Sequence, residues 1–319
     1  MIAATAPSPD APLALTELPS LPLRAGEVRV RVRAIGVNPV DWKMRAGGGP
    51  LGLAQRLIGP RGPVIPGVDF AGEVIERAPD VTALSVGDRV VGGTDFARGQ
   101  RGSYASEVVV RPDQCATLPD AVSFDDAACL PIPGVTARRA LVEHGRIGAR
   151  PGQRVLILSA SGGVGVLAVQ LARGLGATVW GVCSARNAAL VARLGATPID
   201  YGAGDPLAAA KSLGPFDFVL NTVGADRYPV EACRALLGPT GALTLVPVRP
   251  RDYPSIALRR ARALLGRPDR ARLEPLVDAM ARGALTAVIE ARYPLADAEQ
   301  AVARSRGGRV AGKVILNPP

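Results

Sequence analysis

The residues with the clearest chemical meaning form a glycine-containing turn, Ala160-Ser-Gly-Gly-Val-Gly165. The apolar run Val155 to Leu158 precedes it and is typical of a buried parallel strand. The run Val166 to Ala172 follows with the length and composition of a helix. A strand, a glycine turn and a helix start together form a phosphate-binding unit, in which backbone N–H groups and the helix dipole face phosphate oxygens.

A glycine turn alone is a weak signal, and here Ala160 stands at its first glycine position. A turn in some other α/β fold is therefore the alternative. The strand-like run Thr178 to Cys183, arriving after the helix as a dinucleotide-binding unit requires, favours the phosphate site. The turn residues that we expect at the cofactor are Ser161, Gly162, Gly163 and Val164.

The residues after this second strand indicate which nicotinamide cofactor is bound. NAD-binding folds place an acid there for the ribose 2′-hydroxyl, whereas this chain has Ser184-Ala-Arg186-Asn187. A hydroxyl, a guanidinium and an amide suit a 2′-phosphate, with Arg186 as its bidentate partner. Tyr201, after the next short strand, adds a hydroxyl to the same site. We therefore expect NADPH; a solvated loop arginine is the alternative for Arg186.

Length and composition set the outer limits. At 319 residues, two domains are the default. No run is apolar enough to span a bilayer, the N-terminus lacks the features of a signal peptide, and the four cysteines are scattered. We therefore expect a cytoplasmic protein that has no membrane partner. The net charge of +10 could indicate nucleic acid, but 35 of the 38 basic residues are arginines and aromatic residues make up only 4%, so compositional bias is our interpretation.

The N-terminal part is predicted to be β-rich. Glu27 to Arg33 alternates apolar and charged residues, as a strand with one solvated face does. Asn38-Pro-Val-Asp41 then opens a short helix, and several further short strands indicate a small barrel. The glycine-rich stretch Gly47 to Pro66 is predicted to be a loop, either over a substrate cleft or an inert insertion.

Strands alternate with helices between about residues 150 and 250, which predicts a doubly wound α/β sheet. Further parallel strands are expected within Asp217 to Gly224 and from Gly241 to Val246, with a helix from Pro229 to Leu237 between them. We expect the Gly241 strand to be the last of the sheet. The tail from Ala287 to Leu316 reads as strand, helix and strand.

The order of these motifs resembles the medium-chain dehydrogenase/reductase superfamily, in its zinc-free quinone oxidoreductase branch. The resemblance covers nearly the whole chain. It rests on Gly36-Val-Asn-Pro-Val-Asp-Trp-Lys, Pro66-Gly-Val-Asp-Phe-Ala-Gly, Val86-Gly-Asp-Arg-Val, Gly102-Ser-Tyr-Ala-Ser-Glu, Ser159-Ala-Ser-Gly-Gly-Val-Gly and Gly312-Lys-Val-Ile-Leu.

This resemblance implies a GroES-like β-barrel domain and a Rossmann domain. We assign residues 1–122 and 263–319 to the former and 123–262 to the latter. It also implies a cleft active site and a homodimer, in which the last strand of the Rossmann sheet pairs with its copy.

The same resemblance places Asn38 and Thr136 beside the nicotinamide, as catalytic and cofactor-binding residues. Asn38 would donate a hydrogen bond to the substrate, or it would simply cap the turn before Pro39, and the two roles can coexist. Asp41 is interpreted as bracing the short helix, and Tyr104 as core. The resemblance adds Val223, Val246 and Lys313 to the cofactor-binding residues.

Zinc is not expected. Zinc-using members of the superfamily have cysteine, histidine and cysteine where this chain has Asn38, Val68 and Ile132, none of which binds zinc well. The four-cysteine structural zinc loop is also missing. Many relatives have a tyrosine after the Asn38 segment, whereas this chain reads Arg45-Ala-Gly-Gly-Gly-Pro50. The expected phenol is therefore missing from the pocket, which argues against a quinone substrate.

Two functions follow from these residues. The first is an NADPH-dependent, zinc-independent reductase that transfers hydride to an activated C=C bond of an enone, a quinone or a pathway-specific small molecule. The second is a non-reducing member of the superfamily that uses the cleft for binding or for another reaction, such as cyclisation. The phosphate-binding turn with Ser184, Arg186 and Asn187 favours the reductase.

Overall fold

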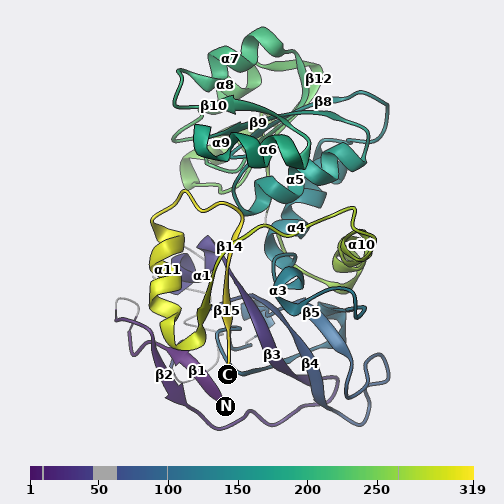
Figure 1. Cartoon of the computed structure of the whole chain (residues 1–319), viewed down its shortest axis with the longest axis vertical. Coiled ribbons are helices and arrows are strands. Elements are labelled where there is room, and N and C mark those ends of the chain that lie inside the picture. The colour runs from purple at the N-terminus through teal and green to yellow at the C-terminus, as the bar shows by residue number, and fades with distance from the viewer. Residues whose placement is uncertain (9–10, 46–62, 99, 265) are drawn as a thin grey trace. The chain divides into compact units, whose positions relative to one another are not determined.

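The computed structural model describes residues 1–8, 11–45, 63–98, 100–264 and 266–319 (Figure 1). Most of the loop predicted between Gly47 and Pro66 lies outside these ranges. The chain divides into two compact units. Unit 1 comprises Met1–Ile132 and Arg267–Pro319, and unit 2 comprises Pro133–Gly266.

Unit 2 contains a six-stranded sheet in the order β10-β9-β8-β11-β12-β13, with every neighbouring pair parallel. Its strands are β8 (Arg154–Leu158), β9 (Thr178–Cys183), β10 (Thr197–Asp200), β11 (Phe216–Asn221), β12 (Leu237–Leu245) and β13 (Arg262–Ala263). The first strand in sequence lies in the middle, which is the order of a doubly wound Rossmann sheet. The predicted fold class is therefore confirmed for this unit.

Helices pack on the sheet of unit 2 because its strands are apolar on both faces. Figure 1 shows α5 and α6 on one side of the strands and α7 and α8 on the other. The edge-to-face pair Trp180 and Phe216, with ring centroids 5.5 Å apart, belongs to the core. The helices are α4 (Pro131–Arg139), α5 (Gly163–Gly174), α6 (Ala188–Leu194), α7 (Pro206–Leu213), α8 (Val230–Arg234) and α9 (Tyr253–Ala257).

Two predictions for the end of this sheet were wrong. The helix expected up to Leu237 ends at Arg234, because Leu237 already pairs with Phe216 in the sheet. The strand expected to be the last, β12, is flanked by the two-residue strand β13. Arg262 and Ala263 carry too little strand pattern to be found from the sequence.

Unit 1 is organised around the long strand β3 (Val28–Val37), which pairs with β15, β4 and β6. Its valines are buried, while Arg31 and Arg33 are exposed, as the alternation predicts. The prediction is wrong for Arg29, which is buried because it pairs with Glu76 and Glu107 on the neighbouring strands. The strand runs four residues beyond the predicted Arg33, because Ile35 to Val37 pair with β15. The other strands are β1 (Ile2–Thr5), β2 (Ala14–Glu17), β4 (Asp69–Arg77), β5 (Arg89–Gly93), β6 (Glu107–Val110), β7 (Cys115–Thr117), β14 (Ile289–Pro294) and β15 (Lys313–Asn317).

The tail of the chain belongs to unit 1 as strand, helix and strand, which confirms the predicted order. The parallel pair β14 and β15 extends the sheet beyond β3, and α11 packs against β15 and β3. The helices of unit 1 are α1 (Pro39–Arg45), α3 (Phe124–Ala127), α10 (Arg270–Ala281) and α11 (Ala298–Arg306).

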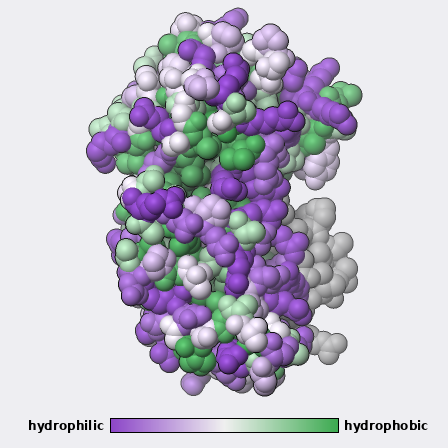
Figure 2. Space-filling view, turned by 90° about the vertical axis from the view of Figure 1, so that its right-hand side faces the viewer, coloured by the Kyte–Doolittle hydropathy of each residue, from purple (hydrophilic) through white to green (hydrophobic). Residues whose placement is uncertain are grey.

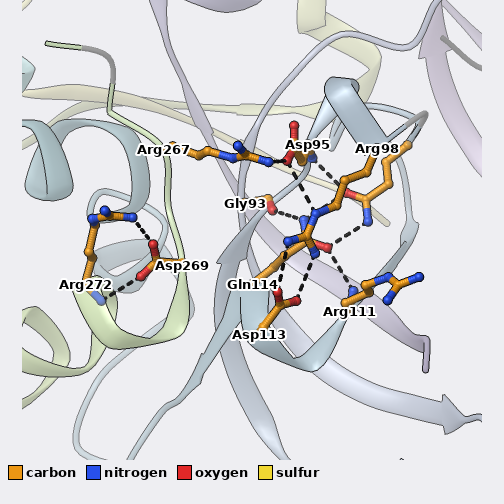
Figure 3. Close-up of polar contacts among 10 residues, drawn as sticks. Gly93, Asp95, Arg98, Arg111, Asp113, Gln114, Arg267, Asp269 and Arg272 are labelled. Carbon is orange, nitrogen blue, oxygen red and sulfur yellow. Dashed lines mark hydrogen bonds and ion pairs between the residues drawn. The ribbon is translucent and has the colours of Figure 1, made fainter. Parts of the chain in front are cut away.

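Ion pairs hold the segment by which the chain re-enters unit 1. Figure 3 shows Asp95, which follows β5, paired with both Arg98 and Arg267. The next residue, Pro268, packs so closely on Gly93 that a Cβ at Gly93 would lie 2.8 Å from the proline ring. Asp269 then accepts the backbone N–H of Arg272 and caps α10. The segment from Arg267 to Asp269, by which the chain re-enters unit 1, is therefore fixed next to the end of β5.

Helix α5 approaches the preceding turn too closely for any side chain at Gly165. A Cβ there would lie 2.1 Å from the carbonyl oxygen of Ser159 and 2.7 Å from the carbonyl carbon of Ala160. At Gly174, the last residue of the same helix, a Cβ would meet nothing within 4 Å. A side chain therefore has space at Gly174 but none at Gly165.

We predict that Gly165→Ala destabilises the protein by about 1–3 kcal/mol or more, because backbone atoms must move. Gly174→Ala is the matched control and should be neutral or stabilise by up to about 1 kcal/mol, because alanine has the higher helix propensity. Urea unfolding of both variants measures the difference. Equal stabilities would show that the close contact at Gly165 does not exist.

Candidate cofactor and active site

The predicted cofactor-binding residues of unit 2 follow the carboxyl ends of parallel strands. Because those ends meet at one edge of a sheet, the residues are brought to the same edge, where doubly wound sheets bind nucleotides. Ser161 to Val164 follow β8, Ser184 to Asn187 follow β9, Tyr201 follows β10, Val223 follows β11 and Val246 follows β12. The crossover point of the topology lies between β8 and β11.

The turn after β8 has the geometry of a phosphate-binding loop. Ser159 has φ +74°, a left-handed conformation that is uncommon for a residue other than glycine. Gly162 is the N-cap of α5 and supplies no side-chain cap, so the first N–H groups of the helix have no partner within the helix. Ala160 is tolerated where a glycine is usual because Gly181 of β9 faces it. A Cβ at Gly181 would lie 2.5 Å from the Ala160 methyl.

The residues proposed for the 2′-phosphate lie next to this turn. Ser184 is extended and leads into a 3₁₀ turn, Ala185–Asn187. The side-chain amide of Asn187 donates to the hydroxyl of Ser161 at 3.0 Å, which joins the ends of β8 and β9 directly. The Arg186 side chain is exposed, and Tyr201 is 38% exposed. No acidic residue occurs between Thr178 and Ile199.

Asn221, which the sequence did not single out, orders the end of β11. It is fully buried, and its Oδ1 accepts the N–H groups of Val223 at 3.0 Å and Gly224 at 2.9 Å. Its amide donates to the carbonyl of Tyr228. The neighbouring Thr222 hydroxyl donates to the carbonyl of Leu158, which ties the end of β11 to the end of β8. A polar residue closing the apolar run Phe218 to Leu220 was the available signal.

In unit 1, Asn38 is at the centre of a buried hydrogen-bond network and is 3% exposed. Its side-chain Nδ2 donates to the carbonyl of Gly36 at 3.0 Å and to the carboxylate of Asp69 at 2.8 Å. Its Oδ1 accepts from the ammonium of Lys313 at 2.7 Å. Its backbone N–H donates to Asp41 at 2.8 Å. Both side-chain N–H bonds of Asn38 are therefore used within the protein, and Oδ1 alone retains a lone pair for a further donor.

Lys313 shares this network. Its Nζ donates to the carbonyl of Val37 and to Asn38, each at 2.7 Å, and lies 3.7 Å from Oδ2 of Asp69. The side chain is 4% exposed. These partners are protein groups, so the proposed contact of Lys313 with the cofactor stays a prediction. Thr136 lies on α4 in unit 2 and is 2% exposed.

Two buried carboxyl groups have raised pKa values. Burial raises the pKa of Asp41 to about 7, against the lowering effect of the Asn38 backbone N–H. Burial likewise raises the pKa of Asp69 to about 6, against Lys313 and the Asn38 amide. Asp41 also accepts a hydrogen bond from the Tyr104 hydroxyl at 3.1 Å, which fits its predicted bracing role. Tyr104 is fully buried in the core, as predicted.

Val68 and Ile132, two of the positions that the resemblance equates with zinc ligands, belong to an apolar cluster. Val68 and Phe96 are buried together, with Val40 and Ile132 packed on them. Within the described ranges, no group of three or more histidine, cysteine, aspartate and glutamate side chains could hold a metal ion. The side chains that line this position therefore suit an apolar group.

None of the helices in the described part of the chain is both long enough and apolar enough to cross a membrane. The face shown in Figure 2 is largely hydrophilic, with apolar residues in small groups.

Comparison with known proteins supports this architecture. Residues 24–120 match the family described as "Alcohol dehydrogenase GroES-like domain", and residues 194–316 match "Zinc-binding dehydrogenase". The chain is 31% identical over 308 residues to the chloroplastic quinone-oxidoreductase homolog of Spinacia oleracea, covering 92% of this chain and 91% of that protein. It is 37% identical over 210 residues to the human mitochondrial NAD(P)H oxidoreductase RTN4IP1, covering 63% of this chain and 52% of that protein.

Among solved structures, the quinone oxidoreductase from Coxiella burnetii matches with a TM-score of 0.86 and 31% identity, over 99% of this chain and 98% of that one. A structure named NAD-dependent alcohol dehydrogenase matches with a TM-score of 0.82 and 25% identity, over 99% of each chain. The predicted pairing of a GroES-like domain with a Rossmann domain is thereby confirmed.

We predict that the purified protein contains less than about 0.1 equivalent of zinc, because Asn38, Val68 and Ile132 offer no thiolate or imidazole ligand. Metal analysis by plasma mass spectrometry after dialysis against zinc measures this directly. Stoichiometric zinc would contradict the prediction.

We predict that Asp41→Asn makes stability less dependent on pH. Because the folded-state pKa of Asp41 is raised to about 7, the folded protein holds a proton that the unfolded chain has lost above pH 3.8. This proton stabilises the fold at acidic pH, and the effect is lost as the pH rises through 7. The upper bound on this stabilisation is about 4 kcal/mol, because the pKa differs by about three units between the folded and unfolded states and each unit corresponds to about 1.4 kcal/mol. Urea unfolding at pH 5 and pH 8 measures the decline, which should be smaller in Asp41→Asn than in the wild type; equal declines would contradict the assignment.

Proposed function

We propose that the chain, which belongs to the medium-chain dehydrogenase/reductase superfamily in its quinone oxidoreductase-like branch, is a zinc-independent, NADPH-dependent reductase of activated C=C bonds. The proposal starts from the coarser function, an oxidoreductase that uses a nicotinamide cofactor. The observation that carries the cofactor choice is the loop after β9. It places Ser184, Arg186 and Asn187 where NAD-binding folds have an acid.

The 2′-phosphate site is supported by charge and by position. A carboxylate after β9 would repel a phosphate, whereas this loop carries a guanidinium and neutral donors. The hydrogen bond from Asn187 to Ser161 joins this loop to the turn that we propose for the pyrophosphate, which supports a shared site. The same loop can therefore serve both phosphate groups of one cofactor.

We propose that the hydride acceptor is an enone, a quinone or another small molecule with a polarised C=C bond. NADPH supplies the hydride when it is bound. The apolar cluster of Val68, Phe96, Val40 and Ile132 suits the hydrocarbon part of such a substrate. Water can deliver the proton at the α-carbon, so that the protein need not contain a dedicated acid.

The hydrogen bonds of Asn38 refine its proposed role. With both side-chain N–H bonds already donated, Asn38 offers the remaining lone pair of Oδ1. That lone pair suits a ribose hydroxyl of the cofactor better than a substrate carbonyl, which needs a donor. We therefore propose that Asn38 orients the nicotinamide ribose. Thr136, the other proposed catalytic residue, retains a hydroxyl that can donate at the nicotinamide end.

Two further proposals accompany this function. We propose a homodimer and a cytoplasmic location, although the names of two relatives place them in the chloroplast and the mitochondrion. A non-reducing member of the superfamily is the competing function. The absence of NADPH binding in the experiment below would favour it.

We predict that Arg186→Ala weakens NADPH binding about tenfold to a hundredfold, the range for losing a hydrogen bond to a charged group. NADH affinity should change less than twofold, because NADH has no 2′-phosphate. Ser184→Asp should shift the preference further toward NADH by adding repulsion and a ribose acceptor. Calorimetric titration of each cofactor into each variant gives the ratio of dissociation constants, and a screen of enones and quinones by NADPH oxidation then tests the reaction.

Arg193→Ala is the matched control, because Arg193 is an exposed arginine on α6 that lies outside the loop. It should leave both dissociation constants unchanged. Equal weakening of NADPH and NADH in Arg186→Ala would assign that arginine a structural role. A wild type that binds neither cofactor at millimolar concentration would overturn the proposed reductase.

A further inference from the structure

Asp69, at the start of β4, is a buried carboxylate on which three separate segments of unit 1 converge. It has no exposed surface. Its Oδ2 accepts the side-chain amide of Asn38 at 2.8 Å, and its Oδ1 accepts the backbone N–H of Ile132 at 3.0 Å. The ammonium of Lys313 lies 3.7 Å from Oδ2. One side chain thus joins the turn after β3, the first turn of α4 and the start of β15.

The chemistry of this position requires a carboxylate. Two N–H donors, from Asn38 and Ile132, face its two oxygens, and an asparagine could accept only one of them. The buried charge of Lys313 also needs a counter-charge, because an unpaired ion in the interior is costly. The negative charge lies at the N-terminus of α4, where the helix dipole favours it.

Close packing leaves this carboxylate little freedom to move. A Cβ at Gly36 would lie 2.2 Å from the carbonyl oxygen of Ala128 and 3.2 Å from Oδ2 of Asp69. The turn that carries Asn38 is therefore pressed against both the segment before α4 and the carboxylate. The direction of the Asn38 amide is set by Asp69 on its nitrogen side and by Lys313 on its oxygen side.

We propose that Asp69 is a positioning residue for the reductase reaction: it fixes the Asn38 amide so that its Oδ1 lone pair is held for the cofactor ribose. This inference rests on the function proposed above. Asp69 itself contacts neither substrate nor cofactor in this role. It acts through Asn38, and that dependence is what an experiment can detect.

A double-mutant cycle tests this dependence with Asp69→Asn, Asn38→Ala and the double variant. Asp69→Asn should lower kcat/KM for NADPH-dependent reduction about tenfold to a hundredfold, because one charge-assisted hydrogen bond is lost and one donor faces another donor. In the Asn38→Ala background the same change should cost less than about threefold, because the residue through which it acts is gone. If Asp69→Asn lowers kcat/KM by the same factor in the wild-type and the Asn38→Ala backgrounds, the two residues act independently and the proposal is overturned.

Two controls separate positioning from general damage. Glu73→Gln makes the same carboxylate-to-amide change on β4, at a residue that pairs with Arg33 near the surface, and should leave kcat/KM unchanged. Binding of 2′-phospho-ADP, which needs only the proposed unit 2 site, should be the same in Asp69→Asn and the wild type within about twofold, because Asp69 lies in unit 1. A loss of that binding in Asp69→Asn would indicate a merely structural role and would overturn the proposal.

A measurement independent of turnover completes the test. Hydrogen exchange followed by mass spectrometry should show faster exchange in the peptides spanning residues 34–42 and 128–135 in Asp69→Asn, and no change in Glu73→Gln. Unchanged exchange in both peptides would overturn the positioning role even if activity falls. A wild type without reductase activity would refute the proposed function, and the exchange result would still decide whether Asp69 holds Asn38.

Discussion

The ion pair between Lys313 and Asp69 is the interaction on which the geometry of unit 1 depends. An ammonium and a carboxylate removed from water are tolerated only when each finds partners, and here the partners come from β3, β4, β15 and α4. Each of those elements is therefore fixed at the end that faces the ion pair. The last strand in sequence must return to lie beside β3, because Lys313 donates to the carbonyl of Val37.

Unit 2 depends on a different constraint, the parallel direction of its strands. Because every strand points the same way, the loops that follow them lie at one edge, and the sheet itself gathers residues that are far apart in sequence. Local bonds then adjust the loops. Asn187 reaches Ser161, and Thr222 reaches the carbonyl of Leu158. The sheet sets the approximate position of the residues proposed to bind the cofactor, and the side-chain hydrogen bonds set their final position.

This difference explains what the sequence could predict. The predicted phosphate-binding unit is local, with its strand, turn and helix contiguous from Val155 to Ala172, so its strand, turn and helix can be recognised in the sequence. The alternation of Val28 to Arg33 likewise predicts the buried valines and the exposed Arg31 and Arg33 of β3, but it does not predict that Arg29 is buried between Glu76 and Glu107. The roles of Asp69 and Lys313 could not be read, because they arise from contacts across 244 residues of sequence. An acid inside the apolar run Val64 to Ala71 was the one available signal, since a buried charge requires a partner.

The neighbours of Asn38 determine whether its side chain can act as a donor or as an acceptor. From the sequence, an asparagine beside the cofactor is a plausible donor to a substrate carbonyl. In the structure its donors are committed to Gly36 and Asp69, and Lys313 already donates to its oxygen, which leaves one lone pair for a further donor. In the proposed role, Asn38 stabilises the position of the hydride donor rather than the charge on the acceptor. The reaction rate should therefore depend strongly on the intrinsic electrophilicity of the substrate, which fits a strongly polarised C=C bond better than an isolated carbonyl.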